Sequence, residues 1–488
     1  MRLAKLASLA LVIALGACEK SNSRYCDANH PCASGFACDE IARQCNPADA
    51  GVVDLGGDLP AVDLAFDQGS CAACGGMTPI CAGATCVACS SDPQCSSQFP
   101  MTPYCLPTGE CAQCRPSMND CTTAAQPICD PNSHACRGCR ANSECASQVC
   151  EGFDESAPGS CVDPGSVLYV GTSNCSDNPN NTGTTPQAPF CTINHALTKV
   201  TATRNLIKIE AGSYAEDVKI TNNAIVTIVG DPGQTSIQAA SSSPFSVTGT
   251  GAKVTLIGLT FTGGMNGGSG IACAGPMSLT VLRCSLDSNE GAGIDVSTKT
   301  GAITIDASLI QRNAGGGIKV GDNNDTTGYT ITNNFITDNG DTTASDFGGV
   351  ILNDKTSPAP NPAKLAGNTI ANNKSKNAYA GVACTNLPVL SIVDDILFNN
   401  VDTIAASETN CTTTFTATDD SIDAARLGAS NQLLSSSPFM SASDYHLAST
   451  AMMCIGTGTD VGLTFDIDGD PRPSPGTSRV DIGADQFK

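Results

Sequence analysis

Hydrophobic positions recur at a regular spacing in the second half of the chain. One eleven-residue pattern occurs six times, and successive copies begin 25, 24, 26, 34 and 27 residues apart. The copies are 254–264, 279–289, 303–313, 329–339, 363–373 and 390–400. In every copy the third and eighth positions are aliphatic or phenylalanine. Short strands that bury these two columns, repeated at this period, predict a β-solenoid in which each copy belongs to one coil.

A polar column and a glycine column accompany the hydrophobic ones. The last position of the pattern is an asparagine in five copies, namely Asn289, Asn313, Asn339, Asn373 and Asn400. In stacked coils these side chains would lie about 4.8 Å apart, which allows amide hydrogen bonds from coil to coil. A second strand is expected after each of the glycines Gly270, Gly293, Gly317, Gly349 and Gly381. A β-sandwich is the alternative fold, but a sandwich has no reason to repeat its sequence at a fixed period.

The first residues of the chain have the layout of a secretory signal peptide. Two basic residues precede an apolar run over 6–15, which is too short to cross a bilayer. Cys18 follows a Gly-Ala pair, and this motif resembles the lipobox of bacterial lipoproteins. The resemblance implies that Cys18 is acylated and that the mature chain is attached to the cell envelope by lipid. Glu19 after the cysteine favours the outer membrane and surface exposure. An ordinary signal peptide with a chance cysteine is the alternative.

Cysteines are concentrated in the first third of the chain. Of 28 cysteines, 21 lie between Cys18 and Cys161. Within 71–163, Cys-x-x-Cys pairs recur every 25 residues, at Cys86/Cys89, Cys111/Cys114 and Cys136/Cys139. An exported chain enters an oxidising compartment, so disulfides are expected here. Zinc ribbons are the alternative for tandem pairs of this kind, although most pairs have no accompanying histidine.

These features divide the chain into six parts. They are a signal peptide (1–17), a small Cys-rich module (18–45), an acidic flexible linker (46–70), a Cys-rich tandem repeat array (71–163), a β-helix (164–445) and a C-terminal closing segment (446–488). The expected fold class is mainly β, with a disulfide-rich, loop-dominated region before the solenoid.

Residues 165–488 resemble the pectin-lyase-like right-handed parallel β-helix repeat family. Near the start, Pro-Phe-Cys-Thr-Ile at 189–193 leads into a short apolar helix, which in such proteins caps the open end of the solenoid. Residues 207–220 are similar to the first coil of these folds. The end, 464–487, resembles the closing segment of the choice-of-anchor Q group of bacterial surface proteins. The resemblance implies the right-handed parallel β-helix and says less about function, because one fold hosts many functions.

Enzymes of this family modify acidic polysaccharides with clusters of Asp and Arg or Lys on one sheet. Asp394 and Asp395 form a paired acidic motif, and two carboxylates can act as acid and base. Consecutive strand residues point to opposite faces, so a turn-lining role is the competing interpretation. Asp295 and Lys319 share a column in adjacent coils, where a solvated ion pair competes with a lyase-type acid and base.

Asp466, Asp468 and Asp470 have the alternate spacing of a calcium loop, but the distal Glu of an EF-hand is missing. A closing turn held by Asp side-chain hydrogen bonds is the competing interpretation. The four histidines lie in separate segments without ligand spacing, so we expect no further cofactor.

Disulfide candidates in the solenoid follow from proximity in the sequence. They are Cys175 with Cys191, Cys384 with Cys411, and Cys273 with Cys284. When Cys18 is set aside, 27 cysteines remain, and Cys454 is the candidate for the unpaired thiol.

The formal net charge of −22 argues against nucleic acid, which requires a basic surface, and disfavours a polyanionic ligand unless a local basic groove exists. We expect a non-enzymatic surface lipoprotein whose solenoid binds glycan or cell-surface matrix, because a solenoid aligns equivalent residues along an extended ligand. A polysaccharide lyase or glycoside hydrolase is the second candidate, and a structural spacer is the third.

Overall fold

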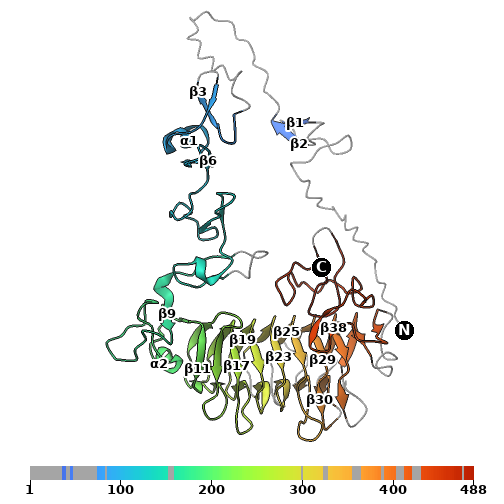
Figure 1. Ribbon diagram of the computed structural model, residues 1–488. Coiled ribbons are helices and arrows are strands. Elements are labelled where there is room, and N and C mark those ends of the chain that lie inside the picture. Colours follow the sequence, from blue (N-terminus) through green and yellow to red (C-terminus); the bar gives the residue numbers. More distant parts are fainter. Residues whose placement is uncertain are drawn as a thin grey trace, which may run out of the picture. The chain divides into compact units, whose positions relative to one another are not determined.

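The computed structural model of the chain describes residues 36–39, 44–47, 74–82, 85–151, 159–297, 301–321, 328–353, 364–377, 379–385, 390–402, 411–419, 430–474 and 477–488 (Figure 1). The chain divides into two compact units, Met1–Ala72 and Ala73–Lys488. In the first unit, β1 (Phe36–Asp39) and β2 (Gln44–Pro47) form an antiparallel hairpin. The expected signal peptide, the lipidated Cys18 and most of the 46–70 linker lie outside the described residues.

The Cys-rich array is a tandem series of four-cysteine modules. In each module the first cysteine is bonded to the third and the second to the fourth. The pairs are Cys89–Cys105 and Cys95–Cys111, Cys114–Cys129 and Cys121–Cys136, and Cys139–Cys150 and Cys145–Cys161, preceded by Cys74–Cys86. The two members of each Cys-x-x-Cys pair therefore belong to neighbouring modules. Because these cysteines are all in disulfides, none of them is a thiolate that a zinc ribbon would require.

The modules contain short elements only. They are β3 (Ile80–Ala82), β4 (Thr85–Val87), α1 (Asp92–Gln98), β5 (Tyr104–Cys105), β6 (Cys111–Ala112), β7 (Ile128–Cys129), β8 (Cys136–Arg137) and the 3-10 helices η1 (Asn142–Glu144) and η2 (Pro164–Ser166). With so little secondary structure, the disulfides and a few ion pairs have to hold the array together.

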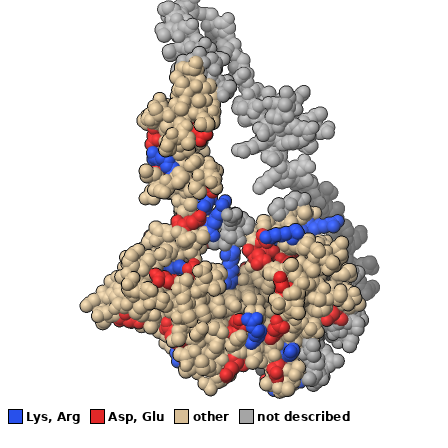
Figure 2. Space-filling model, viewed as in Figure 1, with Lys and Arg blue, Asp and Glu red and all other residues tan. Residues whose placement is uncertain are grey.

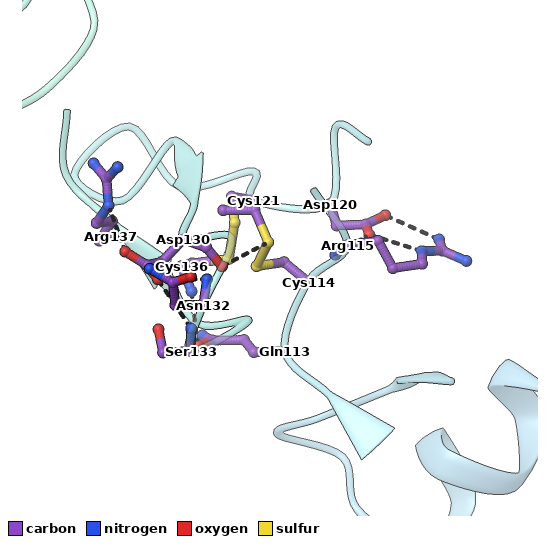
Figure 3. Close-up of a disulfide and its surroundings, with 11 residues drawn as sticks. Gln113, Cys114, Arg115, Asp120, Cys121, Asp130, Asn132, Ser133, Cys136 and Arg137 are labelled. Atoms are coloured by element: carbon purple, nitrogen blue, oxygen red, sulfur yellow. Dashed lines mark hydrogen bonds and ion pairs between the residues drawn. A yellow bond between two sulfur atoms is a disulfide. The ribbon is translucent and has the colours of Figure 1, made fainter. Parts of the chain in front are cut away.

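Arginine side chains join consecutive modules of the array. Each of two arginines contacts one carboxylate of its own module and one of a neighbouring module. The bridges are Asp92–Arg115–Asp120 and Asp130–Arg137–Glu144, with N–O distances between 2.7 and 3.1 Å. Figure 3 shows the Arg115–Asp120 and Asp130–Arg137 pairs beside a disulfide. Disulfides within modules and ion pairs between them make the array a connected chain of small rigid units.

Three parallel sheets form the solenoid, and successive coils contribute one strand to each (Figure 1). Sheet A contains β9 (Val167–Val170), β10 (Leu206–Ile209), β13 (Ile225–Val229), β16 (Lys253–Ile257), β19 (Ser278–Leu282), β22 (Ile303–Asp306), β25 (Tyr329–Thr332), β28 (Lys364–Ala366), β32 (Leu390–Val393) and β35 (Cys411–Thr414). Sheet B contains β11 (Gly212–Ala215), β14 (Thr235–Gln238), β17 (Thr260–Thr262), β20 (Ser285–Asp287), β23 (Leu309–Gln311), β26 (Phe335–Thr337), β29 (Thr369–Ala371), β33 (Ile396–Phe398), β36 (Ala417–Thr418) and β37 (Gln432–Leu433). Sheet C contains β12 (Val218–Ile220), β15 (Phe245–Val247), β18 (Ile271–Cys273), β21 (Ala292–Val296), β24 (Gly316–Val320), β27 (Val350–Asn353) and β31 (Val382–Thr385). The predicted parallel β-helix is confirmed.

The repeated hydrophobic columns form the core of the solenoid. The third position of the pattern lies in sheet A and the eighth in sheet B, and all twelve side chains are at most 4% exposed. They are Leu256, Val281, Ile305, Ile331, Leu365 and Ile392, and Phe261, Leu286, Ile310, Ile336, Ile370 and Leu397. Each coil alone would expose these side chains, so burial depends on the neighbouring coils.

The predicted asparagine column lies at the corner between sheets B and C. Each side-chain amide donates to the Oδ1 of the asparagine in the next coil, at 2.8 to 3.0 Å, from Asn289 through to Asn400. The same Oδ1 atoms accept the backbone N–H of the preceding asparagine at 3.0 to 3.2 Å. The amides also donate to backbone carbonyls, so the buried corner has its polar groups satisfied.

A second polar row, which the sequence pattern did not reveal, occupies the corner between sheets A and B. It runs through Ser308, Asn334, Asn368 and Asp395, the sixth position of the pattern. Ser308 Oγ accepts the backbone N–H of Cys284 at 3.1 Å, and the backbone N–H of Ser308 donates to Asn334 Oδ1 at 3.0 Å. Asn334 Nδ2 donates to Asn368 Oδ1 at 3.0 Å, and Asn368 Nδ2 donates to Asp395 Oδ1 at 2.8 Å. The residue types differ along this row, which is why it does not stand out as a repeat.

The two ends of the solenoid are covered differently. At the first coil, α2 (Ile193–Leu197) buries Ile193 and Ala196 against the core, and Thr192 caps its N-terminus. Near the last coils, β38 (Phe439–Ser441) and β39 (Asp444–Leu447) form a hairpin that packs on sheet B. The minor pair β30 (Lys374–Ser375) and β34 (Val401–Asp402) lies between the main sheets.

Two of the three disulfides predicted for the solenoid are present in the structure, and the third is not. Cys175 is bonded to Cys191 and Cys384 to Cys411. The expected Cys273–Cys284 bond is wrong: both thiols are free and buried, because Cys273 lies in sheet C and Cys284 at the corner of sheets A and B. Cys454, the candidate unpaired thiol, is also free and buried.

The asparagine row generates a test of what stabilises the solenoid. Asn339→Ala should lower the free energy of unfolding by about 1–3 kcal/mol, because it leaves buried donors and acceptors of two adjacent coils without partners. Urea unfolding followed by circular dichroism under oxidising conditions measures the change. Asn180→Ala, at an exposed position, is the control and should change the value by less than about 0.5 kcal/mol. Equal effects of the two substitutions would contradict a stabilising role for the row.

Candidate functional site

A cleft of about 1210 Å³ lies between the last module of the array and the first coils of the solenoid. Segment 140–151 of the array contributes one side, and turn 230–234 after β13 and loop 184–187 contribute to the rest. The sheet A side is lined by Leu206, Lys208, Thr227, Val229, Thr255 and Ile257. Figure 2 shows basic and acidic side chains next to one another at this junction. The array and the solenoid therefore build the cleft jointly.

A row of threonines runs through the cleft along the outer face of sheet A. The same register position holds Thr227, Thr255, Thr280, Thr304 and Thr330 in five consecutive strands. All five are partly exposed, and the first two line the cleft. Parallel strands are spaced at about 4.8 Å, so the row presents a hydroxyl at each such step along the solenoid axis.

Two arginines enter the cleft from different segments. Arg140 comes from the array and Arg283 from the turn that follows β19, and both are half-buried. The backbone N–H of Arg140 donates to Glu144 Oε2 at 2.7 Å, which fixes the turn that carries this side chain. Guanidinium groups form strong hydrogen bonds to carboxylates and other oxygen acceptors. The lining also contains Glu151, Glu210 and Asp231, so the two arginines and Lys208 lie among carboxylates in a cleft of mixed charge.

An ion pair between a buried lysine and a partly exposed aspartate lies at the base of the cleft. Lys208 Nζ is 2.7 Å from Asp231 Oδ1, and the Lys208 side chain is only 2% exposed. Burial lowers the pKa of Lys208, while hydrogen bonding to Asp231 opposes that shift. Glu210 follows on the same strand face, and burial raises its pKa.

Contacts between array and solenoid keep the cleft in shape. Asn142 Nδ2 donates to Asp231 Oδ1 at 2.6 Å, and Tyr169 Oη donates to the carbonyl of Ser147 at 3.1 Å. Both bonds join the third complete module to the first coils. The walls of the cleft are thus fixed by direct hydrogen bonds across the junction.

The paired acidic residues that the sequence offered as catalytic candidates are inaccessible. Asp394 and Asp395 are both fully buried, beneath the closing segment. Asp394 Oδ1 accepts the N–H of Thr459 at 3.0 Å, and its Oδ2 lies 3.4 Å from the buried guanidinium of Arg472. Asp395 is the end of the second polar row. A substrate cannot reach either carboxylate, so their environment gives them a structural role at the corner.

Burial has a large effect on both carboxylates. It raises the pKa of Asp394 to about 7, with Arg472 acting in the opposite direction. It raises the pKa of Asp395 to about 8, although the hydrogen bonds from Asn368 oppose the shift. Asp395 Oδ2 is buried and has no hydrogen-bond partner within the described structure. In the folded protein both groups therefore hold a proton far more readily than in the unfolded chain.

Asp295 and Lys319 lie side by side in sheet C, as their shared column implies. Their side chains form an ion pair at 3.5 Å, with Lys319 42% and Asp295 29% exposed. Sheet C contributes no residue to the cleft lining. This arrangement matches the solvated ion pair and supplies no converging acid and base.

The candidate calcium residues use their oxygens within the closing segment. Asp466 Oδ1 accepts the N–H groups of Asp468 and Asp470, and its Oδ2 accepts the N–H of Gln486. Asp470 pairs with Lys488 at 2.6 Å. The segment thus contains the hydrogen-bonded closing turn, and it also brings one carboxylate oxygen of each of the three aspartates within 4.8 Å of the others, so calcium binding stays a prediction.

His446 belongs to the same segment. Its Nε2 lies 2.9 Å from Asp468 Oδ2 and its Nδ1 2.5 Å from Asp444 Oδ1. These carboxylates, Asp468 foremost, raise the pKa of His446 to about 9. The imidazolium is therefore the charged partner of the acidic turn.

Comparison with known proteins identifies the fold of the solenoid. Residues 191–361 and 246–419 match the family model described as right handed beta helix region. Together with the parallel register of all three sheets, this match confirms the right-handed parallel β-helix predicted from the repeat. No curated protein matches the chain.

Several solved structures are similar in fold. The pectate lyase Pel9A is 16% identical, with 66% of this chain and 96% of that chain covered and a TM-score of 0.39. A pectin methylesterase from Aspergillus niger is 12% identical over 55% of this chain and 91% of its own, with a TM-score of 0.33. PemA from Erwinia chrysanthemi, also a pectin methylesterase, is 14% identical over 54% and 80%, with a TM-score of 0.29. Among the described residues, no helix has the length and apolar character needed to span a membrane.

The cleft itself was not predicted, although part of its signal was present. Threonine occupies the second position of four copies of the pattern, between two buried columns. That column is the outward-facing row on sheet A. The rest of the cleft could not be recognised in the sequence. Segment 140–151 of the array and turn 230–234 of the solenoid are far apart in the sequence and share no motif.

The buried Asp395 generates a prediction about pH. Its folded pKa of about 8 lies above the ordinary value of 3.8, so its protonated form stabilises the fold at low pH. This contribution is complete below about pH 4 and is lost as the pH rises through about 8. Asp394, with a pKa of about 7, acts in the same direction. The melting temperature should therefore fall between pH 5 and pH 9.

Asp395→Asn should remove much of that fall. An amide cannot ionise, so the variant should be about 1–3 kcal/mol more stable than the parent at pH 9, and the difference should be smaller at pH 5. Thermal unfolding at both pH values measures the difference. Asp295→Asn, on exposed sheet C, is the matched control and should leave the pH profile unchanged. If the melting temperature of Asp395→Asn falls with rising pH as steeply as that of the parent, Asp395 does not control the pH dependence of stability.

Proposed function

Because residues 191–419 form a right-handed β-helix, whose sheets align equivalent side chains in rows, we propose that the protein is a non-enzymatic, lipid-anchored envelope protein that binds a glycan chain over sheet A. The observation that carries the proposal is the cleft between the array and sheet A. It combines two threonines of the sheet A row, two arginines and several side-chain amides in one site.

The chemistry of the cleft suits a polar, extended ligand. Gln148, Gln187 and Gln234 line it with the arginines and offer amide donors and acceptors to sugar hydroxyls. The threonine row continues beyond the cleft through Thr280, so a chain bound in the cleft has further hydroxyl partners along sheet A. A repeating polymer matches a repeating row better than a compact small molecule does.

The catalytic alternative requires a converging acid and base in reach of the ligand. Asp394 and Asp395 are buried away from the surface, and Asp295 with Lys319 lies on sheet C. Lys208 at the base of the cleft is paired with Asp231. The cleft lining also includes Glu151 and Glu210 beside the basic residues, so the experiment below has to distinguish binding from cleavage.

Retention on glycans tests the proposal. Residues 19–488 are incubated with a panel of acidic and neutral polysaccharides, and both retention and the release of new reducing or unsaturated ends are recorded. We expect retention without release. Arg140→Ala and Arg283→Ala should each weaken retention about tenfold, as the loss of roughly 1.4 kcal/mol from a charged hydrogen bond implies.

Lys319→Ala, which removes a basic residue of sheet C, is the control and should retain the parent affinity. Release of ends would identify a lyase or hydrolase instead. Absence of retention across the panel would favour a spacer, and an equal loss in Lys319→Ala would mean that net charge rather than the cleft governs binding.

The membrane anchor is tested by Cys18→Ser. In a bacterial host, the parent should be labelled by a fatty-acid analogue and recovered with the membranes, whereas the variant should be unlabelled and recovered in the soluble fraction. The thiol is the acylated group, so a hydroxyl in its place removes the attachment. Ser21→Ala is the control and should behave as the parent does. Labelling of Cys18→Ser would contradict anchoring at this residue.

A further inference from the structure

Lys208 has an unusual position for a lysine. It lies in β10 between Ile207 and Ile209, whose side chains are in the core, so its own side chain points out from sheet A into the junction with the array. There it is only 2% exposed. An ammonium group that is removed from water in this way needs a compensating partner.

The partner is Asp231, in the turn of the next coil. Lys208 Nζ lies 2.7 Å from Asp231 Oδ1, and the same oxygen accepts Asn142 Nδ2 at 2.6 Å. Two donors therefore hold the Asp231 carboxyl in one orientation beside the amine. Glu210 lies two residues beyond Lys208 on the same face and close enough to interact with it electrostatically. A buried amine, a carboxyl held by two donors and a second carboxyl on the same face are thus close to one another.

We propose that Lys208 and Asp231 condense to form an intramolecular isopeptide bond, with Glu210 as the group that transfers the protons. The arrangement holds nucleophile and acceptor in contact, which converts a slow bimolecular reaction into a favourable intramolecular one. The amine is removed from water, since the Lys208 side chain is 2% exposed, whereas Asp231 is 29% exposed at the cleft.

The reaction balances without any co-reactant. The Nζ–Cγ bond forms and one Cγ–O bond of Asp231 breaks. The ammonium contributes three protons: one stays on the amide nitrogen, and two leave with the released oxygen as water. The ion pair and the amide are both neutral overall, so no charge is left behind. Burial lowers the pKa of Lys208 and raises that of Glu210, which favours the free amine and a protonated Glu210 that can donate to the carboxyl oxygen.

The bond would close a loop of the first coils at the place where the array is attached. Lys208 is in β10 and Asp231 follows β13, so the amide would join two successive coils covalently. A pull transmitted through the array enters the solenoid at these coils. A covalent link there prevents the terminal coil from separating, and this holds whether or not the cleft binds glycan.

Peptide mass mapping of the full chain tests the proposal. Trypsin cleaves after unmodified Lys208 and should release 205–208 and 220–253 as separate linear peptides. With the bond, cleavage at Lys208 is blocked, and we expect 205–219 joined to 220–253 at the sum of their masses less one water. Lys208→Arg keeps the charge but should yield linear peptides only.

Two further variants separate chemistry from folding. Asp231→Asn should give the same branched product as the parent, because the amide forms with loss of ammonia in place of water. Glu210→Gln should fold, as judged by circular dichroism, yet leave most of the peptide linear. Lys319→Arg, in the exposed ion pair of sheet C, should match the parent. Linear 205–208 and 220–253 from the parent protein would overturn the proposal and leave a buried ion pair.

Discussion

The structure depends on contacts between neighbouring coils, because a single coil cannot bury its own hydrophobic side chains or pair its own polar groups. One coil buries neither its hydrophobic columns nor the polar groups at its corners, and both are satisfied only by the coils above and below. The asparagine row shows how the two requirements are met together. Each amide donates to the next coil's side chain and to a backbone carbonyl, so packing at the dry corner costs no unpaired polar group.

The same constraint explains the ends of the solenoid. At the first coil, α2 covers the core and the array covers part of sheet A. Further along, one column of sheet B changes from Ser236, Thr260 and Ser285 to Leu309 and Phe335, where the closing segment packs. The outer face becomes apolar where it is covered and stays polar where it meets water.

Much of this fold can be predicted from the sequence, because each coil of a solenoid repeats the same pattern of buried positions. The core columns hold aliphatic residues or phenylalanine, and the corner column holds asparagine in five copies, so both emerge from alignment. The second corner row does not, since a hydroxyl, an amide and a carboxyl fill equivalent positions there. Asp394 and Asp395 looked like a catalytic pair because nothing in their own coil shows that Arg472, 78 residues later, lies against them.

The cleft could not be predicted from the sequence for a related reason. Its two walls come from two kinds of repeat whose sequences show no relation to each other. The disulfide modules end at the face where the threonine row begins, and Asn142 and Tyr169 fix the contact. A site whose walls are held by such bonds before the ligand arrives requires little ordering on binding. In the proposed function the array would contribute to recognition, since without it sheet A would present a row of hydroxyls with no second wall and without Arg140.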